Sequence, residues 1–289
     1  MRHPRRTRND TLAWSGAVDG DAGGAPAVAG DTVVQGAYGS ATAPSAPSAD
    51  GNQALSTGQV PGGQLGRAPA DLRRQTVPNL VGITVNHRSM RGDAHRFAAL
   101  LRDVADGATP NTAERAAAIA AYLETLCDGI HHHHQAEDDV LWPVLEASAG
   151  AEVDLRDLTD DHRQLDPLLD AIRRDARALV AAPHDRAAAD RLATVLGTLR
   201  DLLDEHIEDE ERTVFPVIQR YVSDADWAKV EAAVRKGGKM GFELPRIERY
   251  ATPAELAELK RMAGPVLRVL LAATRRGFAK REAVIFPAS

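Results

Sequence analysis

The sequence has little cysteine, few aromatic residues, no long apolar run and no excess of positive charge. Cys127 is the only cysteine among 289 residues, which excludes an intramolecular disulfide and suits the reducing cytoplasm. A membrane span is not expected, since no run of about 18 apolar residues occurs. The net charge of -6 argues against a general nucleic-acid-binding protein. We therefore expect a cytoplasmic protein whose partners are neither membranes nor nucleic acids.

What the sequence does contain is mainly helix-forming residues, unevenly distributed. Residues 1–76 are rich in Gly, Ala, Pro, Ser and Asp without any helical or strand period, so we expect a disordered low-complexity tail. The rest is rich in Ala, Leu, Glu and Arg, which favours helix. We divide it into a helical bundle over residues 77–222 and a C-terminal helical extension over residues 223–289, packed on the bundle.

The bundle prediction rests on four long segments with apolar residues at helical spacing. These segments cover residues 79–106, 111–148, 155–183 and 185–221. Their short connections favour an all-α, antiparallel, up-down four-helix bundle. Pro143 is expected to kink the second helix and Pro167 to bend the third.

In the extension we expect shorter helices. They cover residues 223–237, 255–262 and 266–278, with an irregular stretch before the second and a break at Pro265. We expect the apolar faces of these helices to pack on the outside of the bundle. The region contains no cluster of metal-ligand residue types.

The second and fourth helices carry the same motif. His133-x-x-x-Glu137 is followed by Trp142-Pro143, and the second copy has His206, Glu210 and Phe215-Pro216 at the same spacing. A His-Arg pair precedes each copy, namely His87-Arg88 and His162-Arg163. The chain therefore reads as two copies of a helix pair.

The spacing of this motif places metal-ligand residue types in the bundle core. Residues four apart share one face of a helix, so His133 and Glu137 lie on the face that carries Ile130 and Leu126. A buried histidine and a buried carboxylate are unfavourable unless each has a partner, and a metal ion is a common partner. A polar network without metal is unfavourable here, because four histidines and two glutamates would have to satisfy one another's hydrogen bonds.

Together, these residues resemble the hemerythrin-like (HHE cation-binding) family, over roughly residues 79–222, with a tail like that of some actinobacterial members. The resemblance implies a non-haem site with two iron ions in an up-down four-helix bundle. His87 and His133 would be terminal ligands of one iron, and His162 and His206 of the other. Glu137 and Glu210 would bridge the two ions.

The sequence departs from oxygen-carrying members of that family, which have five histidines. The positions one turn either side of His162 are Leu158 and Asp166. One coordination position is therefore open, or Asp166 or His134 fills it. We expect the other nearby acids to face away from the metal; they are Asp138, Asp139, Asp209 and Glu211.

The function that the resemblance implies is binding of dioxygen, peroxide or nitric oxide. One form that this function can take is a peroxide-decomposing, catalase-like activity, which would serve in defence against oxidative stress. The alternative is an oxygen- or iron-responsive sensor, or another regulatory module or buffer without turnover. The residues alone do not separate these forms, nor iron from manganese, and they give no oligomeric state.

Overall fold

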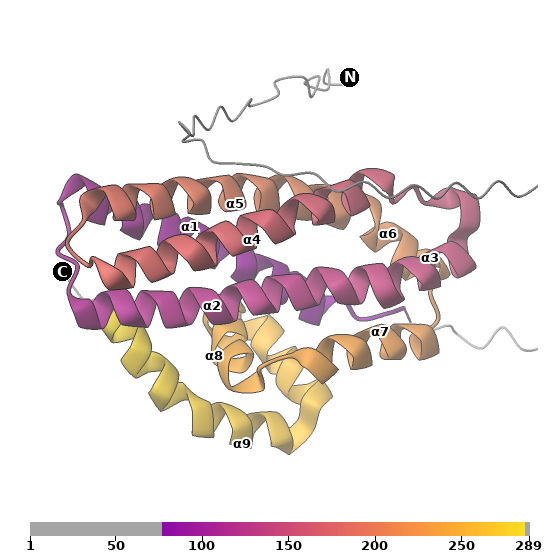
Figure 1. Cartoon of the computed structure of the whole chain (residues 1–289). Coiled ribbons are helices and arrows are strands. Elements are labelled where there is room, and N and C mark those ends of the chain that lie inside the picture. The colour runs from indigo at the N-terminus through magenta and orange to yellow at the C-terminus, as the bar shows by residue number, and fades with distance from the viewer. Residues whose placement is uncertain (1–76, 287–289) are drawn as a thin grey trace, which may run out of the picture. The chain divides into compact units, whose positions relative to one another are not determined.

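The computed structural model describes residues 77–286, and within that range every regular element is a helix. The predicted tail over residues 1–76 lies outside the described residues. Four long helices form the bundle: α1 (Val81–Asp106), α2 (Ala113–Ala136), α4 (Arg156–Ala181) and α5 (Arg186–Thr213). Successive long helices run antiparallel, and α1 packs on α5, α5 on α4 and α4 on α2 (Figure 1). The predicted all-α bundle is confirmed.

Local side-chain chemistry sets the ends of these helices. Gly107 ends α1 with a φ of 77°, a left-handed conformation that glycine adopts without a steric penalty. The Thr112 side chain accepts a hydrogen bond from the Arg115 amide and so caps α2. Asp185 caps α5 in the same way through the Ala187 amide.

The second and fourth predicted helices are both interrupted near the end of their motif. After α2 the chain forms a π-helical turn, η1 (Glu137–Leu141), before α3 (Trp142–Ala149) and a 3-10 turn, η2 (Gly150–Glu152). After α5 it passes through Val214 into α6 (Phe215–Tyr221). Each interruption lies just before a proline, which has no N–H to continue the helical hydrogen bonds.

Three further helices lie against α1 and α2. They are α7 (Asp224–Gly237), α8 (Met240–Tyr250) and α9 (Pro253–Ile285). α7 packs on α2, α8 packs on α1, and α9 packs on both α1 and α2 (Figure 1). The stretch that we predicted to be irregular is in fact α8. The expected break at Pro265 is a kink at the residue before it, Gly264, whose φ is 63°.

Aromatic side chains of α8 and α9 enter the core of the bundle. The Tyr122 ring of α2 lies 4.8 Å from Phe242 of α8 and 6.1 Å from Phe278 of α9, centroid to centroid. Phe242, Phe278 and Ile285 belong to the same buried apolar cluster as the bundle's leucines. The last helices therefore complete a core that α1 and α2 would otherwise leave open. Across residues 77–286, no helix has the length and hydropathy that a bilayer crossing requires.

Candidate metal centre

The structure brings all six predicted ligand side chains, and His134, into the buried interior. None of the seven is more than 7% exposed. They are His87, His133, His134, Glu137, His162, His206 and Glu210. These side chains come from α1, the end of α2 with the π turn, α4 and α5. Helices far apart in the sequence therefore contribute to one cluster, as the bundle topology predicts.

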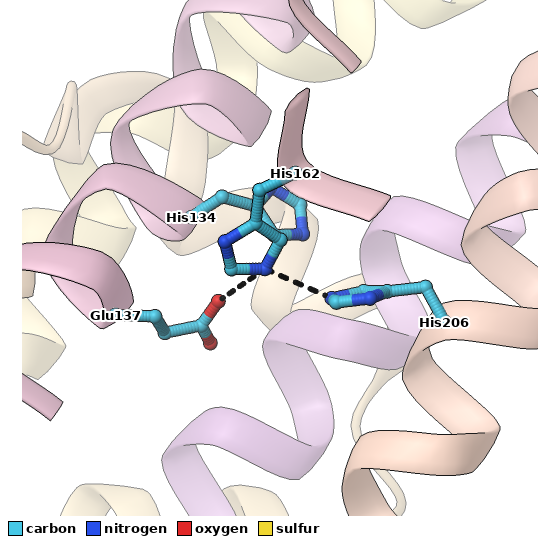
Figure 2. A group of neighbouring side chains, drawn as sticks. All are labelled: His134, Glu137, His162 and His206. Carbon is cyan, nitrogen blue, oxygen red and sulfur yellow. Dashed lines mark hydrogen bonds and ion pairs between the residues drawn. The ribbon is translucent and has the colours of Figure 1, made fainter. Parts of the chain in front are cut away.

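Glu137 is the centre of this cluster. With His134, His162 and His206 it forms a group whose ligand atoms all lie within 4.8 Å of one another (Figure 2). His87 and His133 form a second such group with the same Glu137. One carboxylate is thus shared by two sets of histidines, which is the position of a bridging ligand.

The contacts divide the histidines into two pairs. The Nε2 atoms of His87 and His133 lie 3.0 Å apart, and those of His162 and His206 lie 3.2 Å apart. Glu137 Oε1 lies 2.9 Å from Nε2 of His133, while Oε2 lies 3.7 Å from Nε2 of His162. Each carboxylate oxygen therefore faces a different pair.

Several of the buried polar atoms here have no hydrogen-bond partner. Both carboxylate oxygens of Glu137, both of Glu210 and Nε2 of His134 are buried in this way. Glu137 Oε1 approaches His133 without hydrogen-bond geometry, and Glu210 Oε2 lies 3.4 Å from Nε2 of His87. A buried polar atom without a partner is unfavourable by roughly 1–3 kcal/mol. Imidazole nitrogens and carboxylate oxygens are ligands that suit iron, so these residues fit a metal ion of that kind.

The outer ring nitrogens of the histidines are held by polar groups around the cluster. Nδ1 of His162 lies 2.9 Å from Asp138 Oδ1, and Nδ1 of His87 lies 3.0 Å from Glu211 Oε1. Nδ1 of His134 lies 2.8 Å from the carbonyl oxygen of Ile130. Such contacts fix the rotation of an imidazole ring and leave its Nε2 facing inward.

Sequence reasoning missed the roles of Asp138 and Glu211, which we expected to face away. Each directly follows the glutamate of its motif, so the repeated acid was the available signal. The contacts are crossed: Asp138 of the first copy holds His162 of the second, and Glu211 of the second holds His87 of the first. We call these two hydrogen bonds the crossed braces.

The aromatic residues of the motifs are crossed in the same sense. Trp142 stacks on His162 with ring centroids 5.7 Å apart, and Phe215 stacks on His87 at 5.8 Å. Both pack against a histidine from the other copy of the repeat. We expected them to be packing residues near the site, and this is where they lie.

Asp166 does not lie in this cluster, contrary to one of our two options for the extra ligand. Its side chain is 65% exposed and lies 2.8 Å from Nδ1 of His131. The other option, His134, is buried in the group with Glu137. His132 and His95 also lie outside, His132 at the backbone carbonyl of Val234 and His95 at Asp204.

The electrostatics of the cluster favour neutral histidines on one side. Burial lowers the pKa of His134 well below its ordinary value and also lowers the pKa of His162, so both present a free lone pair. Burial and then the charge of Glu137 raise the pKa of Glu210 to about 8. Two close buried carboxylates repel each other, and a cation between them would remove that penalty.

The other side of the cluster is dominated by negative charge. Burial alone would lower the pKa of His87, but the carboxylates of Glu210, Glu137 and Glu211 outweigh it and raise the value to about 10. For Glu137, burial alone would raise the pKa, but the neighbouring His133 outweighs burial and brings the pKa well below its ordinary value. The site therefore attracts positive charge.

Comparison with known proteins agrees with this geometry. The family model described as the hemerythrin HHE cation binding domain matches residues 82–218. No match was found among the curated proteins or among the solved structures. The matched range runs from the start of α1 into α6 and includes all seven clustered side chains. Residues 82–218 of this chain are therefore a hemerythrin HHE cation-binding domain with a buried candidate metal site.

Proposed function

We propose that the cluster holds two iron ions and binds dioxygen, peroxide or nitric oxide in the cytoplasm. The observation that supports this is the sharing of Glu137 between two groups of buried histidines. Two nearby cations need an anionic bridge to offset their repulsion, and the shared carboxylate supplies one. Bound iron would supply the redox chemistry, including that of a peroxide-decomposing reaction.

The chain's own residues would have distinct tasks. His87 and His133 would hold one ion, while His162 and His206 together with His134 would hold the other. Glu137 would bridge them, with Glu210 as the second bridging carboxylate. The side of His87 and His133 then has one histidine fewer, so we assign the binding of the small molecule to that side.

The metal content of purified protein and variants tests this proposal. The wild type should contain about two iron ions per chain, as in other di-iron bundles. Glu137→Ala should lose both ions because it removes the shared ligand, and His134→Ala should lose about half of the iron. Asp166→Ala is the matched control and should retain the full content. Wild-type levels of iron in Glu137→Ala would contradict the proposal.

A peroxide experiment separates catalysis from binding alone. Oxidised, iron-loaded protein is mixed with hydrogen peroxide while dissolved oxygen and the optical spectrum are recorded. Steady oxygen evolution would support catalase-like activity. A spectral change that reverses on degassing, without evolution of oxygen, would support a sensor or carrier. The packing of α7, α8 and α9 on the ligand-bearing helices α1 and α2 favours this second candidate.

A further inference from the structure

The helices of the C-terminal region, together with α1 and α2, line a partly open cavity next to the metal centre. It has a volume of about 390 Å³ and lies between α1, α2, α7, α8 and α9. Its lining is predominantly apolar and includes Ile83, Met90, Trp227, Val234, Leu244 and Leu267. Pockets for organic molecules typically have volumes of roughly 300–1,000 Å³ with mostly apolar walls and a few polar groups. This cavity matches both properties.

Two of the polar lining residues belong to the metal centre. His133 and Glu137 both line the cavity, on the side of the centre with fewer histidines. A molecule in the cavity would therefore lie beside the cluster. In contrast, His134, His162 and His206 are not among the lining residues.

A third polar group, Arg246 of α8, has an unused donor. Arg246 is only 1% exposed and is one of the residues that line the cavity. Nε donates to Asp93 Oδ2 at 2.7 Å and Nη1 to Glu243 Oε2 at 2.6 Å, while the buried Nη2 has no partner. A guanidinium has only donors, so the missing partner must be an acceptor. The predominantly apolar walls around Arg246 suit an acceptor that is carried on an apolar molecule.

We propose that this cavity binds an organic molecule with an apolar body and an oxygen acceptor, either a carbonyl or a carboxylate. The apolar walls take the body, and Arg246 Nη2 donates to the oxygen. Asp93 and Glu243 already balance the charge of Arg246, so the acceptor does not have to be an anion. The binding itself does not require iron; only its position beside a di-iron centre rests on the proposed function.

Calorimetric titration of the full-length chain with three twelve-carbon probes tests the proposal. 2-Dodecanone and dodecanoate carry the acceptor, and dodecylammonium has the same apolar body with donors only. Both acceptor probes, or one of them, should bind at least about tenfold more tightly than dodecylammonium, the factor that one buried hydrogen bond provides. A preference for the carboxylate would identify a fatty acid, and a preference for the ketone a neutral carbonyl compound. Equal binding of all three probes, or no binding, would overturn the proposal.

Variants locate the binding site. Val234→Trp should fill the cavity and reduce the affinity for the preferred probe at least about tenfold, since it removes the space for the apolar body. Val269→Trp is the matched control on α9, where Val269 is 68% exposed and lies outside the cavity, and it should bind normally. Arg246→Lys keeps the charge beside Asp93 but removes Nη2, and should abolish the preference for acceptors. If Arg246→Lys does not fold, the Val234→Trp variant tests the site alone. An affinity of Val234→Trp for the preferred probe equal to that of the wild type would refute the site.

The same titration on metal-free protein keeps this proposal separate from the proposed function. Probe binding should persist without iron, since the apolar walls and Arg246 belong to the protein. If the probe binds to iron-loaded protein without changing the optical spectrum of the bound iron, only the position beside the metal centre is refuted. Loss of the di-iron function with intact probe binding would refute the proposed function and leave the cavity assignment standing.

Discussion

At the scale of single residues, the crossed braces are the most informative contacts around the centre. Asp138 and Glu211 are only about one-third exposed, and each accepts a hydrogen bond from a histidine of the other repeat. They do not need to touch a metal to matter, because an imidazole that rotates freely is a poorer ligand.

Removing one brace should weaken metal binding without abolishing it. Asp138→Asn replaces the carboxylate that orients His162, and we expect the affinity for iron to fall by about 10–100-fold. Competition with a chelator on wild type and variant measures the change. Asp139→Asn is the matched control, since Asp139 is an exposed neighbour on the same turn. An affinity loss in the control equal to that in Asp138→Asn would show that the effect is only one of surface charge.

The identity of the clustered side chains could largely be predicted from spacing, because residues four apart share a helix face whatever the tertiary structure. The choice between His134 and Asp166 could not. Asp166 is four residues after His162, but the buried stripe of α4 continues through Leu165 and Leu169, on the other flank of that face. His134 is buried beside His133 because α2 is covered by α4 and also by α7 and α9.

At the scale of helices, the breaks in the motif helices are the main difference from the sequence prediction. A proline permits either a kink or a local change of hydrogen bonding, and the sequence does not distinguish them. At η1 the chain adopts a π turn, which widens the helix at the residue that both histidine groups share. The predicted segments that start at residues 185 and 223 begin at the caps of α5 and α7, Asp185 and Ser223, because the capping signal is local.

The start of α9 gives a prediction about pH. Hydrogen bonds from Arg88 and from the Thr252 amide lower the pKa of Glu255 to about 2, from its ordinary value of 4.5. A carboxyl whose pKa is lower in the folded state stabilises the fold above its unfolded pKa and loses that effect as pH falls. The stability advantage of wild type over Glu255→Gln should therefore be present at neutral pH and disappear between about pH 5 and pH 2.

Urea unfolding of both proteins across this pH range measures the difference. Thr252→Ala serves as the comparison, because it removes the cap at the start of α9 and should lower the free energy of unfolding by about 1 kcal/mol at every pH. A constant difference between wild type and Glu255→Gln down to pH 2 would rule out the Glu255 ionisation as its source.

At the scale of the whole molecule, a buried polar network joins the bundle to the later helices. Asp93 of α1 is 0% exposed and accepts hydrogen bonds from Tyr122 of α2 and from Arg246 and Tyr250 of α8. The sequence predicted that the extension packs on the bundle, but not this network, because its members are far apart in the chain and follow no periodic pattern.

Breaking this network should be costly. Arg246→Met removes the closer of the two guanidinium groups at the buried Asp93 carboxylate and leaves only Arg96, at 3.4 Å. We expect a loss of about 3 kcal/mol in the free energy of unfolding. Tyr250→Phe removes one neutral donor and should cost only about 1 kcal/mol. Chemical denaturation monitored by circular dichroism compares the two. Losses of the same size in both variants would mean that the ion pair contributes no more than a single hydrogen bond.

The crossed braces also bear on how such a domain can originate. Each copy of the repeat provides an acid and an aromatic ring that the other copy's histidine requires, so one copy alone could not orient its own ligand. Two identical half-length chains related by a twofold axis would, however, satisfy every one of these contacts. A dimeric ancestor of half the size of the bundle would thus already have had the six ligands that the two copies share, and gene fusion would only have joined what symmetry had assembled.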